Sequence, residues 1–131
     1  NHADLSEMRL APCAYSMTFN VSGNRLNAIL NQRSQDMLTA NNWNVCQYAA
    51  LLTMFAKASG FVPGELVHVI ADAHIYDRHV DAVRRLIEKK PYPAPEMQVE
   101  DITDFYKFTK NSFTAVDYKY HEFTGKIPVA V

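Results

Sequence analysis

Cysteine and glycine are scarce in this sequence, which has two cysteines and four glycines in 131 residues. Cys13 and Cys46 form no Cys-x-x-Cys pair, which excludes the disulfide framework of a small secreted domain and the cysteine-rich zinc sites. The glycines form no Gly-x-Gly-x-x-Gly run, so the fingerprint of a dinucleotide-binding loop is missing. We therefore expect two reduced thiols and no nicotinamide site.

Net charge and long apolar runs are lacking as well. Thirteen basic residues oppose 14 acidic ones, so no broad field directs the chain to nucleic acid or to a membrane surface. No run reaches the roughly 18 apolar residues that span a bilayer, and the first residues lack the regions of a signal peptide. These absences predict a soluble, cytoplasmic protein without membrane or nucleic-acid partners. The start at Asn1, without an initiator Met, is compatible with a processed product or a piece of a longer protein.

The hydrophobic content of 48% is enough for one core, so we expect residues 1–131 to form a single domain. Residues 14–21 alternate with the period of two that a half-buried strand requires. A turn at residues 22–24 follows, and residues 25–32 alternate in the same way. The pattern predicts a hairpin with Cys13 and Arg33 at the same open end.

The rest of the chain mixes helices and strands. Residues 43–59 contain neither proline nor glycine and predict a helix of about four to five turns, buried on most sides, with Cys46 as a small core residue. The other predicted elements are a turn at 61–64, an apolar strand at 65–71, a helix at 78–89 capped by Asp77, short strands at 96–99 and 113–120, and one helical turn within 101–108. This order predicts an α+β fold.

Residues 31–36 concentrate polar groups directly after the second predicted strand. A guanidinium offers a rigid fork to phosphate, and amide, hydroxyl and carboxylate groups match the edges of a polar ring. Arg33 is also expected near Cys13, where a fixed positive charge lowers the pKa of a thiol and favours the nucleophilic thiolate. The same residues are compatible with a solvated strand end and an inert thiol.

Two further chemistries use residues of this chain. Residue types that bind metals lie close together at Asp72, His74, Asp77, His79 and Asp81. His74 and His79 are five residues apart, which does not align them on one helix face, so we expect no metal site. Cys13, His74 and Asn44 are the residue types of a thiol hydrolase, but the local signatures of such enzymes are absent.

Five motifs occur in a specific order along the chain. They are Ala11-Pro12-Cys13, Gln32-Arg33-Ser34-Gln35-Asp36, Trp43-Asn44, Asp72-Ala73-His74-Ile75-Tyr76 and Pro128-Val129-Ala130-Val131. Together they resemble the carboxyl-terminal half of the thymidylate synthase family, from about Met8 to the end of the chain. The resemblance implies a thymidylate synthase-like α+β fold with a twisted mixed sheet and a long buried helix. It also implies a homodimer formed through the sheet and an amino-terminal half missing from these residues.

The resemblance implies a methyltransferase that converts dUMP to dTMP, with 5,10-methylenetetrahydrofolate donating both the one-carbon unit and the hydride. No metal takes part. Cys13 would add to C6 of uracil, and Asn44 would bond the O4 and N3 edge. The implied catalytic residues are Cys13, Asn44 and Asp36. The implied dUMP-binding residues are Gln32, Arg33, Ser34, Gln35, Asp36, Asn44, His74 and Tyr76. Folate would be bound by Asp36 and, through its backbone, by Ala130.

The sequence departs from the family pattern at two places. Ala14 follows Cys13 where many members have histidine, and residues 40–43 replace a Gly-Leu-Pro-Phe-like run. Because the missing half would supply further phosphate and folate contacts, we expect these residues alone to be inactive. Two alternatives are a pyrimidine nucleotide hydroxymethylase of the same superfamily and a noncatalytic half-domain that dimerises.

Overall fold

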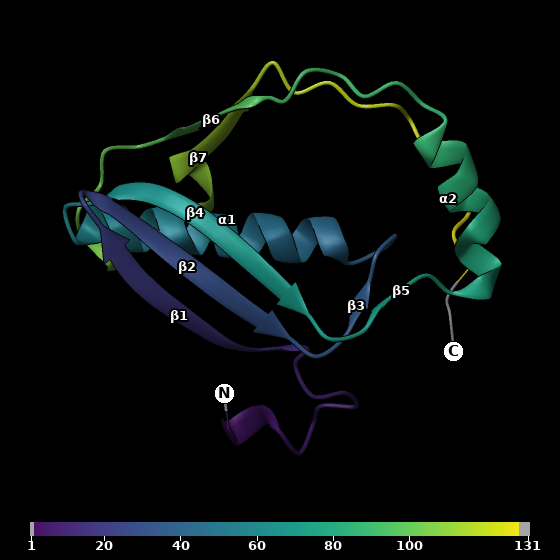
Figure 1. Cartoon of the computed structure of the whole chain (residues 1–131), viewed down its shortest axis with the longest axis horizontal. Coiled ribbons are helices and arrows are strands. Elements are labelled where there is room, and N and C mark those ends of the chain that lie inside the picture. The colour runs from purple at the N-terminus through teal and green to yellow at the C-terminus, as the bar shows by residue number, and fades with distance from the viewer. Residues whose placement is uncertain (1, 129–131) are drawn as a thin grey trace.

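The computed structural model describes residues 2–128 and is built on a three-stranded sheet (Figure 1). The strands β1 (Ala14–Ser22), β2 (Arg25–Gln32) and β4 (Val62–Ile70) lie in the order β1-β2-β4. β1 runs antiparallel to β2 and β4 runs parallel to it, so the sheet is mixed. Gly23 turns the chain between β1 and β2 with φ of 60°, a conformation that glycine adopts without steric cost. The predicted hairpin is confirmed.

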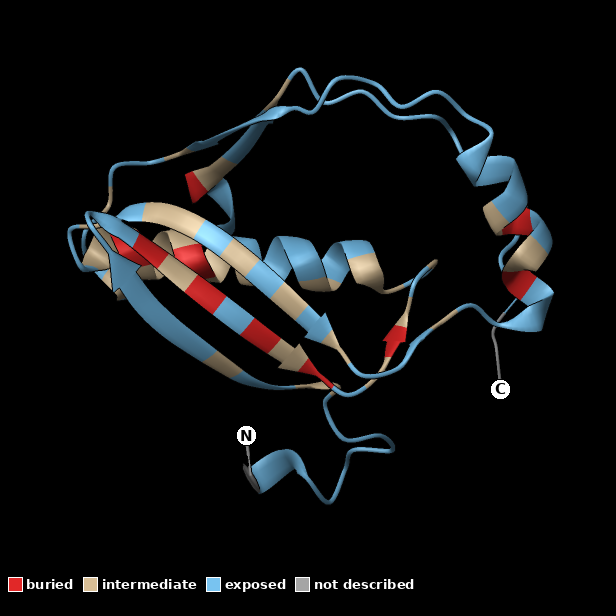
Figure 2. Ribbon diagram, viewed as in Figure 1, coloured by how far each residue is buried: buried red, intermediate tan, exposed pale blue. Residues whose placement is uncertain are grey.

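The helix α1 (Asn41–Ala58) connects β2 to β4 and covers one face of the sheet (Figure 1). A crossover of this kind is what two parallel neighbouring strands require. Leu26 and Ala28 of β2 pack with Leu52 and Ala56 of α1 to form the core. Four partly buried side chains surround this cluster: Met17, Phe55, Phe61 and Leu66. Figure 2 shows the buried positions alternating along β2, as the period-two pattern predicts.

The opposite face of the sheet is open and mixed in character. Asn31 Nδ2 donates to Ser16 Oγ at 3.0 Å, and Asn27 Nδ2 donates to Asn20 Oδ1 at 3.1 Å. Three β-branched side chains share this face with the polar groups and are 37–48% exposed: Ile29, Val67 and Val69. The sheet therefore has one face covered by α1 and one face available for another surface.

The remaining elements extend from the sheet and the helix α1. They are β3 (Gln35–Asp36), β5 (Ala73–His74), α2 (Val80–Ile87), β6 (Glu96–Val99), β7 (Phe113–Val116) and the 3-10 turns His2–Asp4, Asp77–His79, Phe105–Lys107 and Lys110–Ser112. Figure 1 shows α2 apart from the sheet, with two extended segments running side by side between α2 and the ribbon of β6 and β7. His121 Nε2 donates to the Lys90 carbonyl at 2.9 Å and joins these segments.

Three boundaries differ from the sequence predictions. The turn expected at residues 61–64 is wrong, because Pro63 and Gly64 belong to β4 beside a register shift against β2. Asp77 does not cap α2, since it lies in a 3-10 turn and the helix starts at Val80. β7 ends at Val116, before Asp117, which has φ of 58° and breaks the extended backbone.

The expected burial of α1 also differs. Leu52 and Ala56 are buried, but Trp43 is 80% exposed and Cys46 is exposed as well. The prediction that Cys46 is a core residue is wrong in this chain, because the side of α1 that carries it faces away from the sheet. Among the helices described within residues 2–128, none has the length and apolar character to cross a membrane.

Candidate active site

The open end of the hairpin brings Cys13 and Arg33 together, as predicted. The Arg33 backbone N–H donates to the Cys13 carbonyl at 2.9 Å, and the Arg33 guanidinium donates to the Ala11 carbonyl at 2.7 Å. Residues 11–13 are thus held from two directions. The Ala11 bond uses one of the five N–H donors of an exposed guanidinium. Arg33 positions the segment that carries the thiol and retains donors for an anion.

A group of amides lies behind this strand end. Gln32 is 2% exposed and Gln35 is 1% exposed. Gln32 Nε2, which has two hydrogens, faces three acceptors: the Ser34 carbonyl at 2.8 Å, Gln35 Oε1, and Asn44 Oδ1 at 3.4 Å. Gln32 Oε1 lies 3.0 Å from His68 Nε2 on β4. Because buried amides require partners, these contacts supply the hydrogen-bonding needs of Gln32 at the strand end.

Asp36 holds the loop that leads into α1. Its carboxylate accepts from the Leu38 backbone N–H at 2.9 Å, from the Thr39 backbone N–H at 3.1 Å and from the Thr39 hydroxyl. Burial raises the pKa of Asp36, but the bonds from Thr39 and Leu38 and the nearby His79 outweigh it and leave the pKa below its ordinary value. Asp36 is therefore a carboxylate at neutral pH and accepts hydrogen bonds.

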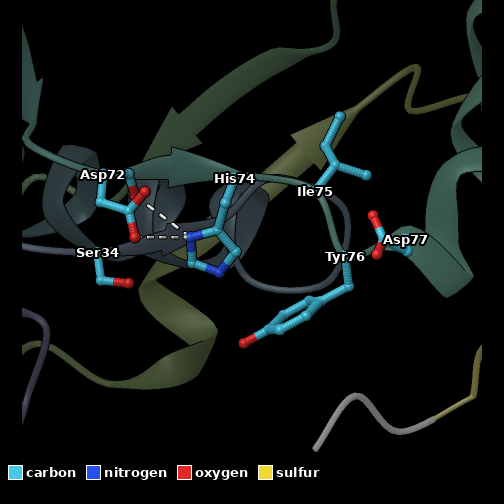
Figure 3. Close-up of a pocket in the computed structure, with 6 residues that line it drawn as sticks. All are labelled: Ser34, Asp72, His74, Ile75, Tyr76 and Asp77. Carbon is cyan, nitrogen blue, oxygen red and sulfur yellow. Dashed lines mark hydrogen bonds and ion pairs between the residues drawn. The ribbon is translucent and has the colours of Figure 1, made fainter.

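The short strands β3 and β5 place His74 beside this loop. Asp36 pairs with His74 in a parallel register, and the Met37 N–H donates to the His74 carbonyl at 3.0 Å. His74 Nδ1 lies 3.3 Å from Asp72 Oδ2, and the rings of His74 and Tyr76 meet edge to face at 5.0 Å. Figure 3 shows the imidazole between the Asp72 carboxylate and the Tyr76 ring.

Two adjoining cavities collect these side chains. One, of about 210 Å³, is lined by Leu10, Cys13, Gln32, Ser34, Gln35, Asp36, Ala40, Asn44, His74 and Tyr76. A second, of about 470 Å³, is lined by Ser34, Asp72, His74, Ile75, Tyr76 and Asp77 (Figure 3). They share Ser34, His74 and Tyr76, so a ligand with a ring and a polar extension has room in both.

The smaller cavity brings together most of the residues predicted from the sequence. Arg33 does not line it, although its neighbours Gln32 and Ser34 do, and Ala130 lies outside the described residues. Leu10 and Ala40 line the cavity without having been predicted, because an apolar side chain gives no chemical signal in a sequence. Within residues 2–128, no group of three His, Cys, Asp or Glu side chains has the arrangement of a metal site.

Comparison with known proteins shows the family of the chain. A family model described as thymidylate synthase matches residues 1–131. The chain belongs to the thymidylate synthase family. The thymidylate synthase of Bacillus phage phi3T is 36% identical over 121 residues, which are 92% of this chain and 43% of that protein. Thymidylate synthase 1 of Bacillus amyloliquefaciens is also 36% identical, over 92% of this chain and 53% of that protein.

The fold is that of thymidylate synthase. A solved structure of the thermostable thymidylate synthase A from Bacillus subtilis superposes with a TM-score of 0.88 at 33% identity, covering 98% of this chain and 46% of that one. The chain therefore spans about half the length of the thymidylate synthases that it matches.

Two histidines that act on residues of the site were missed in the sequence. His79 is 1% exposed, and its Nε2 donates to the Pro128 carbonyl at 2.8 Å, which ties the end of the described chain to the turn before α2. Its Nδ1 is buried without a partner among the described residues. His68 contacts Gln32, although its place within an apolar strand gave no signal. Both contacts join residues that are distant in sequence.

Proposed function

We propose that the protein containing this chain converts dUMP to dTMP, and that the chain supplies the nucleophile and the pyrimidine site. The observation that carries this proposal is the cavity of about 210 Å³ in which Cys13, Asn44, Asp36, His74 and Tyr76 meet. A thiol and an amide edge lining one hollow are what addition to a conjugated pyrimidine requires.

Cys13 acts first in the proposed reaction. Its thiolate donates an electron pair to C6 of uracil, a C–S bond forms, and the C5–C6 π electrons move toward the O4 carbonyl. An N–H donor of Asn44 meets the negative charge on O4, an interaction commonly worth about 3 kcal/mol in the transition state. The resulting enolate carries a nucleophilic C5. C5 attacks the methylene carbon of the folate substrate and then loses its proton as the bond between the methylene and the folate nitrogen breaks. Hydride transfer from the folate to the methylene completes the methyl group, and the Cys13 thiolate leaves as the C–S bond breaks.

The other residues hold the two substrates. Arg33 and Ser34 bind the nucleotide phosphate, since a guanidinium fork and a hydroxyl suit an anion. His74 and Tyr76 bind the deoxyribose hydroxyl. Asp36, as a carboxylate, accepts N–H bonds from the folate ring, and Ala130 contacts the folate through its backbone. The proposed reaction needs no metal and no nicotinamide. We also propose that the protein is cytoplasmic.

Release of tritium from C5 of labelled dUMP tests the nucleophile. In the complete protein, Cys13→Ser should abolish release and leave dUMP binding within about threefold, because the weakly acidic hydroxyl does not form the anion that attacks C6. Cys46→Ser is the matched control, since Cys46 is exposed and lies outside this cavity. Turnover retained by Cys13→Ser contradicts the proposal, and a product heavier by one oxygen identifies a hydroxymethylase.

The same assay separates this chain from the complete protein. The isolated 131 residues should release no tritium, because about half the family's length is missing and, with it, about half of the phosphate and folate contacts. Addition of the amino-terminal half as a separate polypeptide should restore release. Activity of the isolated chain comparable to the complete protein would contradict this part of the proposal.

We also propose that the open face of the sheet forms a homodimer. Ile29, Val67 and Val69 are apolar and 37–48% exposed on adjacent strands, beside the Asn and Ser pairs described above. Burying this surface against a second copy removes apolar area from water. Equilibrium sedimentation of Val67→Lys tests the interface: the variant should be monomeric, and an undiminished dimer excludes this face.

A further inference from the structure

His79 is a buried imidazole that lies outside both cavities and acts on residues of the site. It is 1% exposed and lines neither cavity. Its ring meets the Tyr76 ring edge to face at 5.6 Å, and Tyr76 lines both cavities. Its charge also acts on the Asp36 carboxylate. His79 is therefore close to residues that are proposed to bind each of the two substrates.

The imidazole also holds the end of the described chain. Its Nε2 donates to the Pro128 carbonyl at 2.8 Å, beside α2 (Figure 1). Among the residues that the structure describes, this is the one hydrogen bond that reaches residues 123–128. Phe123 and Ile127 of this segment are 42% and 37% exposed, so apolar packing holds it only in part. His79 is thus the polar anchor of this segment.

This anchor lies close to a residue proposed to bind folate. Ala130 follows Pro128 by two residues, and two residues of chain span at most about 7 Å. A fixed Pro128 carbonyl therefore limits how far Ala130 can lie from His79. The same imidazole acts on Asp36, the other residue proposed to bind folate. Both proposed folate contacts are thus tied to His79.

We propose that His79 is a positioning residue for the folate substrate, which holds the chain end at Pro128 beside the loop of Asp36. This inference rests on the proposed function. A backbone contact at Ala130 binds folate more tightly when the backbone before it is already held, because ordering it on binding lowers the affinity. dUMP should not depend on the bond to Pro128, since its proposed partners lie within residues 32–76.

The first experiment measures two dissociation constants by calorimetry in the complete protein: that of dUMP, and that of tetrahydrofolate in the presence of dUMP. His79→Leu should weaken tetrahydrofolate binding about tenfold and leave dUMP binding within about twofold, because leucine keeps the packing against Tyr76 and loses the bond to Pro128. His79→Gln should bind tetrahydrofolate nearly as well as wild type, since its Nε2 can reach the same carbonyl.

The matched control is His121→Leu. It removes a second bond between an imidazole and a carbonyl in the same part of the chain, at 2.9 Å to Lys90, and that bond is exposed. We expect it to change neither dissociation constant.

The outcomes separate the two proposals. Wild-type protein that fails to bind dUMP, or to bind tetrahydrofolate in its presence, refutes the proposed function. Wild-type protein that binds both, with unchanged tetrahydrofolate affinity in His79→Leu, refutes the role of His79 alone. A merely structural role would weaken both ligands in His79→Leu or leave His79→Gln as weak as His79→Leu, and either result overturns the inference. If His79→Leu does not fold, His79→Asn takes its place, because its amide is too short for the Pro128 carbonyl.

A second experiment tests the anchor without a variant or a ligand. Nitrogen-15 spectra of the wild-type imidazoles, at a pH where they are neutral, distinguish a proton on Nε2 from one on Nδ1. We expect the His79 proton on Nε2, since the Pro128 carbonyl only accepts hydrogen bonds. A proton on Nδ1 would mean that this bond does not form, and it would overturn the inference.

Discussion

Asp36 offers a direct test of how the loop before α1 is held. Its carboxylate receives two backbone N–H bonds, at 2.9 Å from Leu38 and 3.1 Å from Thr39, together with the Thr39 hydroxyl. The Asp36 carbonyl also accepts from the Ala40 N–H at 3.2 Å, so the residue closes the turn that leads into α1 at Asn41. Replacing Asp36 by Ala removes the three side-chain bonds, whereas Asp36→Asn keeps one carbonyl acceptor for the backbone amides.

The expected magnitudes follow from these bonds. A hydrogen bond to a charged group contributes about 1.5–3 kcal/mol and a neutral one about 1 kcal/mol. Water reaches the partly exposed carboxylate and replaces part of what is lost. We expect Asp36→Ala to lower the free energy of unfolding by about 2 kcal/mol and Asp36→Asn by about 1 kcal/mol.

The ionisation of Asp36 makes the free energy of unfolding depend on pH in a predictable direction. The folded-state pKa of Asp36 lies below the ordinary value of 3.8, so its charge stabilises the fold above the unfolded-state pKa. This contribution is lost as the pH falls through the lowered pKa. The difference between wild type and Asp36→Asn should therefore be full near pH 7 and shrink as the pH falls below about 4.

Urea unfolding followed by circular dichroism at several pH values measures both effects. Asp101→Asn is the control, because the Asp101 side chain is 98% exposed and pairs with Lys57 at 3.4 Å, so no measurable change is expected. An unchanged urea midpoint for Asp36→Ala would refute the reasoning. A difference in the free energy of unfolding between wild type and Asp36→Asn that stays constant down to pH 3 would refute it as well.

Two further predictions concern packing. Gly64→Ala should lower the free energy of unfolding by about 1–3 kcal/mol in urea unfolding. A Cβ at this position collides with the Asn27 side chain and comes within 2.8 Å of the Leu26 carbonyl. A variant as stable as wild type would contradict the close packing of β4 against β2. Leu52→Ala should cost about 2–5 kcal/mol, since Leu52 is 3% exposed in the core. Leu86→Ala, at a side chain 49% exposed on α2, should cost far less, and equal losses would contradict the assignment of the core.

The hairpin and the family could be predicted from local information. Alternation within each strand and a turn between them depend on neighbouring residues, so β1 and β2 follow from the pattern in residues 14–32. The motifs around Cys13, Gln32–Asp36 and Asp72–Tyr76 are specific in combination, and the match over residues 1–131 confirms the family. Individual roles at these positions stay predictions until the variants are measured.

Boundaries and burial were harder to predict, because they depend on what packs where. Pro63 and Gly64 read as a turn in the sequence, but the close approach of Asn27 on β2 makes Gly64 part of β4. Cys46 reads as a core residue because its helix is apolar all round, yet in this chain its side of α1 is exposed. A helix with apolar residues on every side indicates burial without saying which segment provides it.

The sequence by itself determined which chemical groups this protein has and which of them lie at strand ends, because residue type, period and turn chemistry are local properties. Only the tertiary structure decided how those groups are oriented. The bond between Gln32 and His68 spans 36 residues and the bond between His79 and Pro128 spans 49. No local pattern predicts such contacts, because they exist only once the sheet and the chain end have folded against their neighbours.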